Sequence, residues 1–206
     1  MSTDKSLFYY GSIYHRLFDP QIAETRQVTV DYINEKSSVL DIACGTGQLC
    51  FALREQKQCH VVGLDLSIRM LEFARKCDPL QNITFIHGDA TNLESFSDHS
   101  FDYATMLMLM HELPGTQQVC VLKEALRVAS NCIIIDAVTP LPKNAEGIGI
   151  RIVERTFGHN HKANFKSFLA TGGIRRILEE SGLPIKTEHS SLFCRNCREI
   201  IVISTK

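Results

Sequence analysis

The 206-residue sequence lacks the marks of several protein classes. No apolar run reaches the ~18 residues that a membrane-spanning helix needs, and the first residues, Met-Ser-Thr-Asp-Lys, lack the apolar segment of a signal peptide. The formal net charge of −1 gives no electrostatic reason to expect a nucleic acid or an anionic membrane as partner. We therefore predict a cytoplasmic protein without a membrane span or a nucleic-acid partner, and leave the oligomeric state unassigned.

The eight cysteines do not form the framework of a disulfide-rich domain. They fall mostly within expected strands and helices, which predicts reduced thiols in a cytosolic environment. The pair Cys194 and Cys197 has a spacing met in redox and zinc sites, but no second ligand pair accompanies it. We interpret this pair as the end of a hairpin.

Residues 39–50 form the stretch around which the chain is organised. A short apolar run of strand length stops at Gly45 and Gly47, after which a helical pattern begins. Glycines at such a turn let a ligand lie against the backbone, so we predict a nucleotide site at the carboxyl end of a first parallel strand. The chain has no Gly-Lys-Ser/Thr, which excludes a P-loop, and Cys50 stands where a dinucleotide fingerprint has its third glycine.

The sign of one charge distinguishes between the remaining nucleotides. Asp41 lies inside the end of this strand and faces the loop. In a low-dielectric crevice its carboxylate would repel a pyrophosphate and attract an ammonium or sulfonium group. The sequence therefore favours a cationic adenosyl ligand.

Four motifs, at residues 41–47, 61–67, 83–90 and 101–106, occur in the order found in one enzyme family. The first, Asp-Ile-Ala-Cys-Gly-Thr-Gly, resembles motif I of the class I S-adenosylmethionine-dependent methyltransferases, especially the small-molecule branch that includes the quinone-biosynthesis enzymes. The resemblance covers roughly residues 37–137, about half of the chain. It implies S-adenosyl-L-methionine as cofactor and methyl transfer to a small-molecule acceptor.

The resemblance places the cofactor at the tips of the first four strands, where parallel sheets bind ligands. Asp41 would act through the ammonium of the methionine moiety, Asp65 would grip the ribose hydroxyls, and Asp89 would meet the adenine amine. Alternatively, Asp65 caps the turn at Ser67, and Asp89 forms an Asx turn. The predicted cofactor-binding residues are Tyr14, Asp41, Ala43, Cys44, Gly45, Gly47, Asp65, Leu66, Asp89, Ala90, Met106 and Leu107.

His111, just beyond the fourth expected strand, is the tentative catalytic residue. An imidazole titrates near neutrality and could be the general base for an acceptor hydroxyl or amine. The alternative is a histidine that merely begins the next helix. The neighbouring Met108, Leu109 and Met110 are expected in the core.

Two further segments could cover the site. The aromatic stretch at residues 6–18 either packs on the core or closes over the ligand through Tyr10 or Tyr14. The pattern of residues 143–176 predicts three short helices, the second capped by Asn164. This segment is locally basic, and it either exposes its charged face to solvent or forms a lid that prefers an acidic or polar substrate. Because His159 and His161 have no obvious third or fourth ligand, we predict no metal site.

The expected architecture is one α/β domain, a three-layer sandwich around a mostly parallel seven-stranded Rossmann-like methyltransferase sheet with a C-terminal antiparallel hairpin. The resemblance implies the strand order 3-2-1-4-5-7-6. We divide the domain into four parts: an N-terminal flap and helix (1–36), a cofactor-binding core (37–138), a substrate-lid insertion (139–182) and a terminal hairpin (183–206).

The methyl acceptor stays open: a quinone-like phenol, an amine, a thiol, or a metalloid held by Cys44 and Cys50. A catalytically silent regulator or partner subunit of the same fold is an alternative, although the intact acids argue for retained ligand binding. A nicotinamide oxidoreductase is disfavoured by Asp41 and the absent third glycine. A nucleic-acid methyltransferase is disfavoured because the fourth strand ends in Met-Leu-Met-Leu rather than in Asn/Asp-Pro-Pro-Tyr/Phe.

Overall fold

The computed structural model describes residues 11–78 and 81–204. Tyr10 and the aromatic residues before it, which we expected to form a flap, lie outside the described residues. Within the described part, no helix is both long and apolar enough to cross a bilayer.

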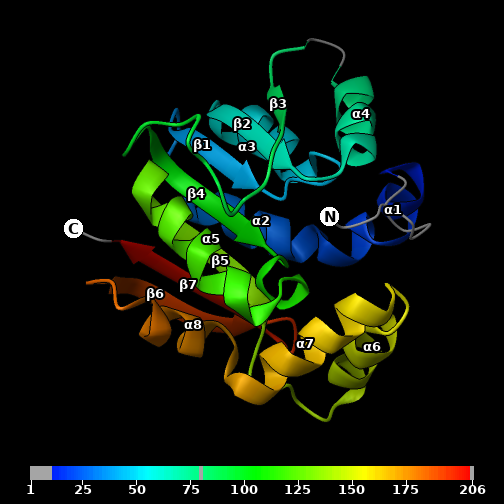
Figure 1. Cartoon of the computed structure of the whole chain (residues 1–206). Coiled ribbons are helices and arrows are strands. Elements are labelled where there is room, and N and C mark those ends of the chain that lie inside the picture. The colour runs from blue at the N-terminus through cyan, green and yellow to red at the C-terminus, as the bar shows by residue number, and fades with distance from the viewer. Residues whose placement is uncertain (1–10, 79–80, 205–206) are drawn as a thin grey trace.

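A seven-stranded sheet forms the centre of the molecule (Figure 1). Its order, β3-β2-β1-β4-β5-β7-β6, confirms the predicted topology. The first five strands run parallel, whereas β7 pairs antiparallel with both β5 and β6. The strands are β1 (Ser38–Ile42), β2 (His60–Asp65), β3 (Thr84–His87), β4 (Phe101–Leu107), β5 (Ala129–Ala137), β6 (Lys186–Phe193) and β7 (Arg198–Ser204).

Helices from the first part of the chain cover one face of the sheet. Val30, Leu53 and Leu71, one from each of three helices, pack with the inward side chains of β1 and β2 in a buried cluster. The expected helix from Asp19 begins as a 3-10 turn containing the helix-starting Pro20 and becomes α-helical four residues later. The elements are α1 (Gly11–Leu17), η2 (Asp19–Ile22), α2 (Ala23–Tyr32), α3 (Gln48–Lys57) and α4 (Ile68–Cys77).

The opposite face is covered by later helices. Leu122, Phe168 and Ile177 pack against β4, β5 and β7 in a second buried cluster, because apolar residues recur along one side of each helix. These helices are α5 (Gly115–Val128), α7 (His159–Thr171) and α8 (Gly173–Ser181), and a 3-10 turn, η3 (Met110–Glu112), precedes α5. The predicted three-layer sandwich is confirmed.

The insertion between β5 and β6 begins with α6 (Ala145–Glu154) and continues into α7 and α8. Three helices were predicted, but the role assigned to Asn164 was wrong. The N-cap of α7 is Gly158, whose positive φ of 109° turns the chain, so Asn164 lies inside the helix. Its side-chain amide donates a hydrogen bond of 2.6 Å to the carbonyl of Glu112, which ties α7 to η3.

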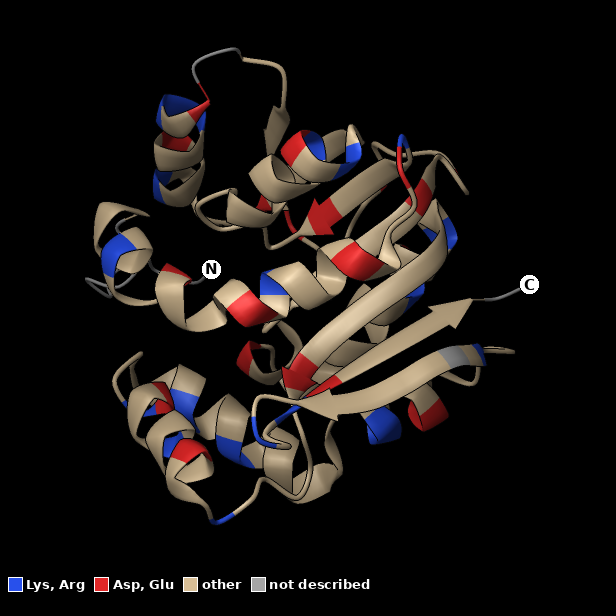
Figure 2. Ribbon diagram, turned by 180° about the vertical axis from the view of Figure 1, so that it is seen from behind, with Lys and Arg blue, Asp and Glu red and all other residues tan. Residues whose placement is uncertain are grey.

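The arrangement of the helices positions the site. Figure 1 shows α1, α6 and α7 on the side of the molecule toward which the parallel strands point. In open α/β sheets this edge is where ligands bind. Figure 2 shows acidic and basic residues interspersed over the helices, and the insertion carries both signs of charge.

Candidate functional site

Three of five successive residues in the loop after β1 have a left-handed backbone conformation. The φ angles of Ala43, Gly45 and Gly47 are 60°, 54° and 77°. A Cβ on Gly47 would lie 2.9 Å from Phe85 Cζ, whereas a Cβ on Gly45 would meet no atom within 4 Å. Gly47 is therefore required by the protein's own packing, and the space beside Gly45 is open to a ligand.

Ala43 stands in this loop with a conformation that strains a residue carrying a Cβ. Because glycine adopts it without that strain but is more flexible when unfolded, we expect Ala43→Gly to stabilise the protein by about 0.5–1 kcal/mol. Urea unfolding measures this effect. Ala52→Gly, within α3, is the control and should cost about 1 kcal/mol. An equal loss at both positions would contradict the inferred strain.

Asp41 is buried beneath the loop, with 3% of its surface exposed. Its carboxylate accepts hydrogen bonds from the hydroxyl of Thr105 at 2.7 Å and from the thiol of Cys50 at 3.3 Å. Burial raises the pKa of Asp41 to about 6, and the two hydrogen bonds only partly oppose this. The structure therefore holds a carboxylate whose negative charge is poorly compensated by the protein itself.

Asp65, at the end of β2, joins two loops. One carboxylate oxygen accepts from the backbone N–H of Gly45 at 2.8 Å, and the other accepts from that of Ser67 at 2.7 Å. The capping role is thus present, and Ser67 itself caps α4 through Met70. Asp65 nonetheless remains partly exposed and lies directly beside the glycine loop, while the side chain of Leu66 is 52% exposed.

The residues after β3 and β4 differ in what they offer to a ligand. Asp89 is exposed and accepts hydrogen bonds from the backbone and hydroxyl of Thr91, which is the Asx turn given as its alternative; Ala90 packs partly against the core. Met106 is fully buried in the core cluster, so its side chain does not border the open edge as expected, whereas Leu107 is partly exposed.

Met108 corrects another expectation. Leu109 and Met110 are buried in the core as predicted, but Met108 has a φ of 56° and lines a cavity. The left-handed turn occurs where β4 ends, and the backbone N–H of Met108 donates to the carbonyl of Ile135. The turn therefore directs the Met108 side chain away from the core.

The cavity has a volume of about 440 Å³ and lies between the end of β4 and the helices α1, η2, α6 and α7. Tyr14, on α1, is the member of the predicted cofactor set that lines it. Burial raises the pKa of its phenol, so the group is a neutral hydroxyl at physiological pH. The lining comprises Tyr14, Phe18, Gln21, Ile22, Met108, His111, Glu112, Ala145, Glu146, Gly149, Ile150, Val153, Glu154, Phe157, His161 and Arg198.

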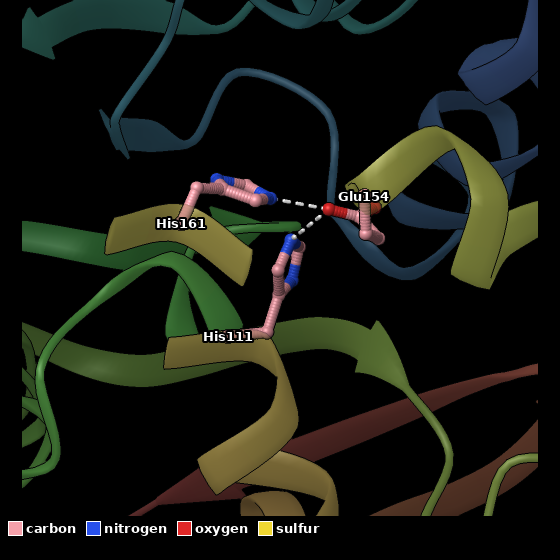
Figure 3. Close-up of side chains that lie close together, drawn as sticks. All are labelled: His111, Glu154 and His161. Atoms are coloured by element: carbon pink, nitrogen blue, oxygen red, sulfur yellow. Dashed lines mark hydrogen bonds and ion pairs between the residues drawn. The ribbon is translucent and has the colours of Figure 1, made fainter. Parts of the chain in front are cut away.

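His111, Glu154 and His161 meet at the wall of this cavity (Figure 3). Both imidazoles point toward one carboxylate oxygen of Glu154, which contacts His161 Nε2 in a hydrogen bond and lies 3.4 Å from His111 Nε2. On its other side, His111 Nδ1 bonds to Asp136 Oδ1 at 2.6 Å. Asp136 also accepts from the backbone of His111 at 3.1 Å, so the ring is fixed from two directions.

The charges in this cluster depend on one another. Burial alone lowers the pKa of His111, but Asp136 and Glu154 outweigh it, and the pKa stands well above its ordinary value. Burial would raise the pKa of Glu154, but hydrogen bonds from His111 and His161 lower it to about 2. The cluster therefore stabilises positive charge at His111.

The sequence prediction singled out His111 but did not connect it with Glu154 or Asp136. Asp136 could have been found, because β4 pairs with β5 and Leu107 lies opposite Ile135, which places the next residues together. Glu154 belongs to an insertion outside the recognised motifs. Its only signal in the sequence is its place before Gly158, with His161 on the other side of that glycine. His159, the other half of the predicted histidine pair, is exposed and is not part of the cluster.

All eight cysteines are free thiols, as predicted. Cys50 is fully buried, and the hydrogen bond with Cys44 together with burial raises its pKa well above the ordinary value. Metal and metalloid ions bind the thiolate form, so this pair is poorly suited to a metalloid acceptor. Cys194 and Cys197 lie at the β6–β7 turn, where Asn196 has a φ of 63°.

The sheet order, the glycine loop and the acids at the strand tips define a Rossmann-like domain of the methyltransferase architecture. A family model described as a methyltransferase domain matches residues 39–131. Residues 39–131 are therefore similar to methyltransferase domains, and to the quinone-biosynthesis enzymes among them.

The curated relatives include demethylmenaquinone methyltransferases. That of Staphylococcus epidermidis is 37% identical over 117 residues, which cover 55% of this chain and 45% of the relative. That of Listeria monocytogenes is 38% identical over 101 residues, covering 47% and 41%. The chain therefore spans less than half the length of these relatives.

Solved structures show the same fold over nearly the whole chain. The PH0226 protein of Pyrococcus horikoshii aligns with a TM-score of 0.70 at 22% identity, covering 94% of this chain and 98% of its own. A putative methyltransferase of Haloferax volcanii, solved in complex with the Trm112 methyltransferase activator, aligns with a TM-score of 0.73 at 14% identity, covering 98% and 99%. At these identities the likeness establishes the fold.

Proposed function

We propose that this chain transfers a methyl group from S-adenosyl-L-methionine to a small molecule bound in the cavity. One observation carries the proposal: the glycine loop with its buried acid and the cavity lie at the same carboxyl edge of the sheet. Binding two reactants side by side can supply about 7–11 kcal/mol of the activation barrier in well-aligned systems. A cofactor crevice next to an acceptor space is the arrangement that this requires.

The residues of the loop fit a cationic adenosyl ligand. Gly45 leaves open space where a side chain would stand, and Asp41 holds a buried negative charge that a cation would stabilise. In the proposed assignment Asp65 holds the ribose and Asp89 with Ala90 meets the adenine. When bound, the cofactor supplies a sulfonium methyl, which passes to the acceptor's lone pair while the broken S–C bond leaves its electrons on sulfur.

The chain's own residues would position the acceptor and exclude water. Tyr14, on α1, and Met108, just after β4, both lie on the cavity wall. The helices α6 and α7 would serve as the lid. The lid was predicted to prefer an acidic or polar substrate. The acidic half of this prediction receives little support, because three carboxylates line the cavity beside one guanidinium and two imidazoles, those of Glu112, Glu146, Glu154, Arg198, His111 and His161.

His111 is the proposed site of proton handling when the acceptor must lose a proton. Its Nδ1 is engaged by Asp136, so Nε2 would be the atom that accepts. To act as a base, Nε2 must first lose its own proton and its contact with Glu154. The raised pKa of His111 keeps that proton bound near neutrality. Proton transfer through His111 would therefore become faster as the pH rises.

The acceptor that we propose to test first is demethylmenaquinone, the substrate in the name of the curated relatives. Both polar groups and apolar side chains, such as Ile150 and Val153, line the cavity, which suits a ring with hydroxyl or carbonyl oxygens. The free thiols are consistent with a cytoplasmic location, which we also propose.

The direct test uses radiolabelled S-adenosyl-L-methionine and demethylmenaquinone with a shortened side chain, in oxidised and reduced form. We expect label in the organic product at a rate that depends on both reactants. Cofactor binding without transfer to this or any other quinone-like, amine or thiol acceptor would instead favour the silent regulator.

Gly149 allows the acceptor space to be tested separately from the cofactor site. It lines the cavity from α6, and a Cβ there would meet no atom within 4 Å. We expect Gly149→Phe to raise the KM for the acceptor at least tenfold, because the ring fills the cavity, with cofactor affinity within twofold of the parent. Ile152→Phe, at a position 58% exposed on the same helix, is the matched control.

Steady-state kinetics and calorimetry with S-adenosylhomocysteine measure the two effects. If Gly149→Phe left the acceptor KM unchanged, the cavity would not be the acceptor site. If it weakened cofactor binding as strongly as acceptor binding, the separation of the two sites would be wrong.

A further inference from the structure

The cluster of His111, Glu154 and His161 has the composition of a metal site. One donor atom from each residue lies within 4.8 Å of the others, and Figure 3 shows the three side chains converging from η3, α6 and α7. We propose that these residues bind a divalent transition-metal ion, for which Zn²⁺ is the best-matched candidate, at the wall of the cavity.

The donor set selects the kind of ion. Imidazole nitrogen suits zinc and other late first-row metals, whereas Mg²⁺ and Ca²⁺ prefer sites made of oxygen atoms. Two histidines and one glutamate are a ligand set of catalytic zinc sites, in which three protein ligands leave one position open. An ion about 2.0–2.2 Å from each donor would draw the three atoms to roughly 3–4 Å from one another, which small side-chain adjustments achieve.

Asp136 supports the site from behind. A metal-binding histidine usually donates its other ring N–H to a carboxylate or carbonyl group, which fixes the ring and its tautomer. The 2.6 Å contact of His111 Nδ1 with Asp136 Oδ1 is this arrangement, and it directs Nε2 toward Glu154. Asp136 is fully buried, so the orientation of the ring is built into the fold.

The surroundings also favour a cation. The side chains of His111, Glu154 and His161 are 2%, 10% and 6% exposed, yet all three residues line the cavity and are reachable from it. A bound ion would replace the protons by which the histidines now contact Glu154. Our expectation of no metal rested on the absence of a third ligand near His159 and His161, and Glu154 with His111 supplies what was missing.

The open coordination position of the ion would face the cavity, so the ion would contact the methyl acceptor. This role rests on the proposed methyl transfer. An acceptor hydroxyl bound to the ion would have a lowered pKa. Its O–H bond would break with the proton passing to solvent and the electron pair staying on oxygen. The ion thus selects acceptors with a hydroxyl or enol oxygen, and His111 would then act as a ligand instead of a base.

The test begins with the full-length protein, freed of metal by a chelator and dialysed against Zn²⁺ alone. We expect one zinc per chain by elemental analysis after gel filtration. Glu154→Gln and His161→Ala should each weaken zinc binding at least tenfold, whereas His159→Ala, on the same helix but exposed, should match the parent. Thermal unfolding without metal shows whether each variant is folded.

A spectroscopic measurement on the unaltered protein avoids reliance on variants. Co²⁺ should bind with the visible absorption of a low-coordinate nitrogen and oxygen site, and one equivalent of Zn²⁺ should abolish it. Less than half an equivalent of zinc, or equal affinity in the His161 and His159 variants, would overturn the proposal. Calorimetry with S-adenosylhomocysteine is run in parallel, because loss of that binding would count against the proposed function and not against the metal site.

Discussion

Replacing Asp41 by asparagine is expected to lower the affinity for S-adenosyl-L-methionine at least tenfold while making the ligand-free protein more stable. The amide keeps the size of the side chain and can still accept the hydrogen bond of Thr105, but it cannot attract a cationic ligand. The affinity falls because the charge is lost. The stability rises for the same reason, since the buried charge is unfavourable without the ligand.

The pH dependence of the stability follows from the raised pKa of Asp41. Burial raises it from 3.8 to about 6, so the folded protein holds this proton more tightly than the unfolded chain does. Below about pH 4 Asp41 is protonated in both states and does not lower the free energy of unfolding. Its ionisation lowers that free energy by an increasing amount between pH 4 and 6, and by a constant amount of about 3 kcal/mol above pH 6. Asp41→Asn should show its full advantage at pH 7–8 and none near pH 4.

Chemical unfolding across this pH range and calorimetry at pH 7.5 measure the two effects. Asp31→Asn, an exposed acid on α2, is the control and should change neither quantity. A variant at position 41 that bound the cofactor as tightly as the parent would remove the electrostatic basis for the cofactor assignment.

Two alanine substitutions in the glycine loop are expected to have opposite profiles. Gly45→Ala adds a methyl group where no protein atom lies within 4 Å, at a φ of 54°. It should cost about 1–2 kcal/mol of stability through backbone strain and at least tenfold in cofactor affinity, because the methyl group occupies ligand space. Gly47→Ala brings its Cβ within 3.2 Å of the Ala74 side chain as well as close to Phe85, which adds about 1–3 kcal/mol of overpacking to the strain.

The ratio of the two effects tells ligand contact from folding. Urea unfolding and cofactor titration are measured on both variants, with Gly115→Ala as a control at an unstrained, open position. The loss of stability of Gly45→Ala can account for a loss of cofactor affinity only by lowering the fraction of folded protein. If the measured loss of affinity were no larger than that, the ligand would not lie in the open space beside Gly45.

The sheet could be predicted because its information is local. Most of the parallel strands are short apolar runs followed within a few residues by a glycine or an acid, and the order of the motifs gave the strand order through the family resemblance. Asn164 was misplaced because a residue that suits a cap can also lie inside a helix when tertiary contact uses its side chain.

The site was predicted only in part, because part of it depends on contacts distant in sequence. The loop and its acids follow one another along the chain, so a pattern reveals them. Glu154 reaches His111 across 43 positions of sequence, and the fully buried Met106 differs from the partly exposed Leu107 only through the pleat of β4. A contact between residues so far apart leaves no periodic signal in the sequence and needs the folded structure.

The central claim is that the glycine loop holds the adenosyl cofactor with its sulfur directed toward the cavity. A crystal structure with S-adenosylhomocysteine bound tests this most directly. The account predicts the ligand against Gly45, its amino group on the side of Asp41, and its sulfur facing the space between Met108 and Tyr14. A ligand seated elsewhere, or a sulfur turned away from that cavity, would contradict it.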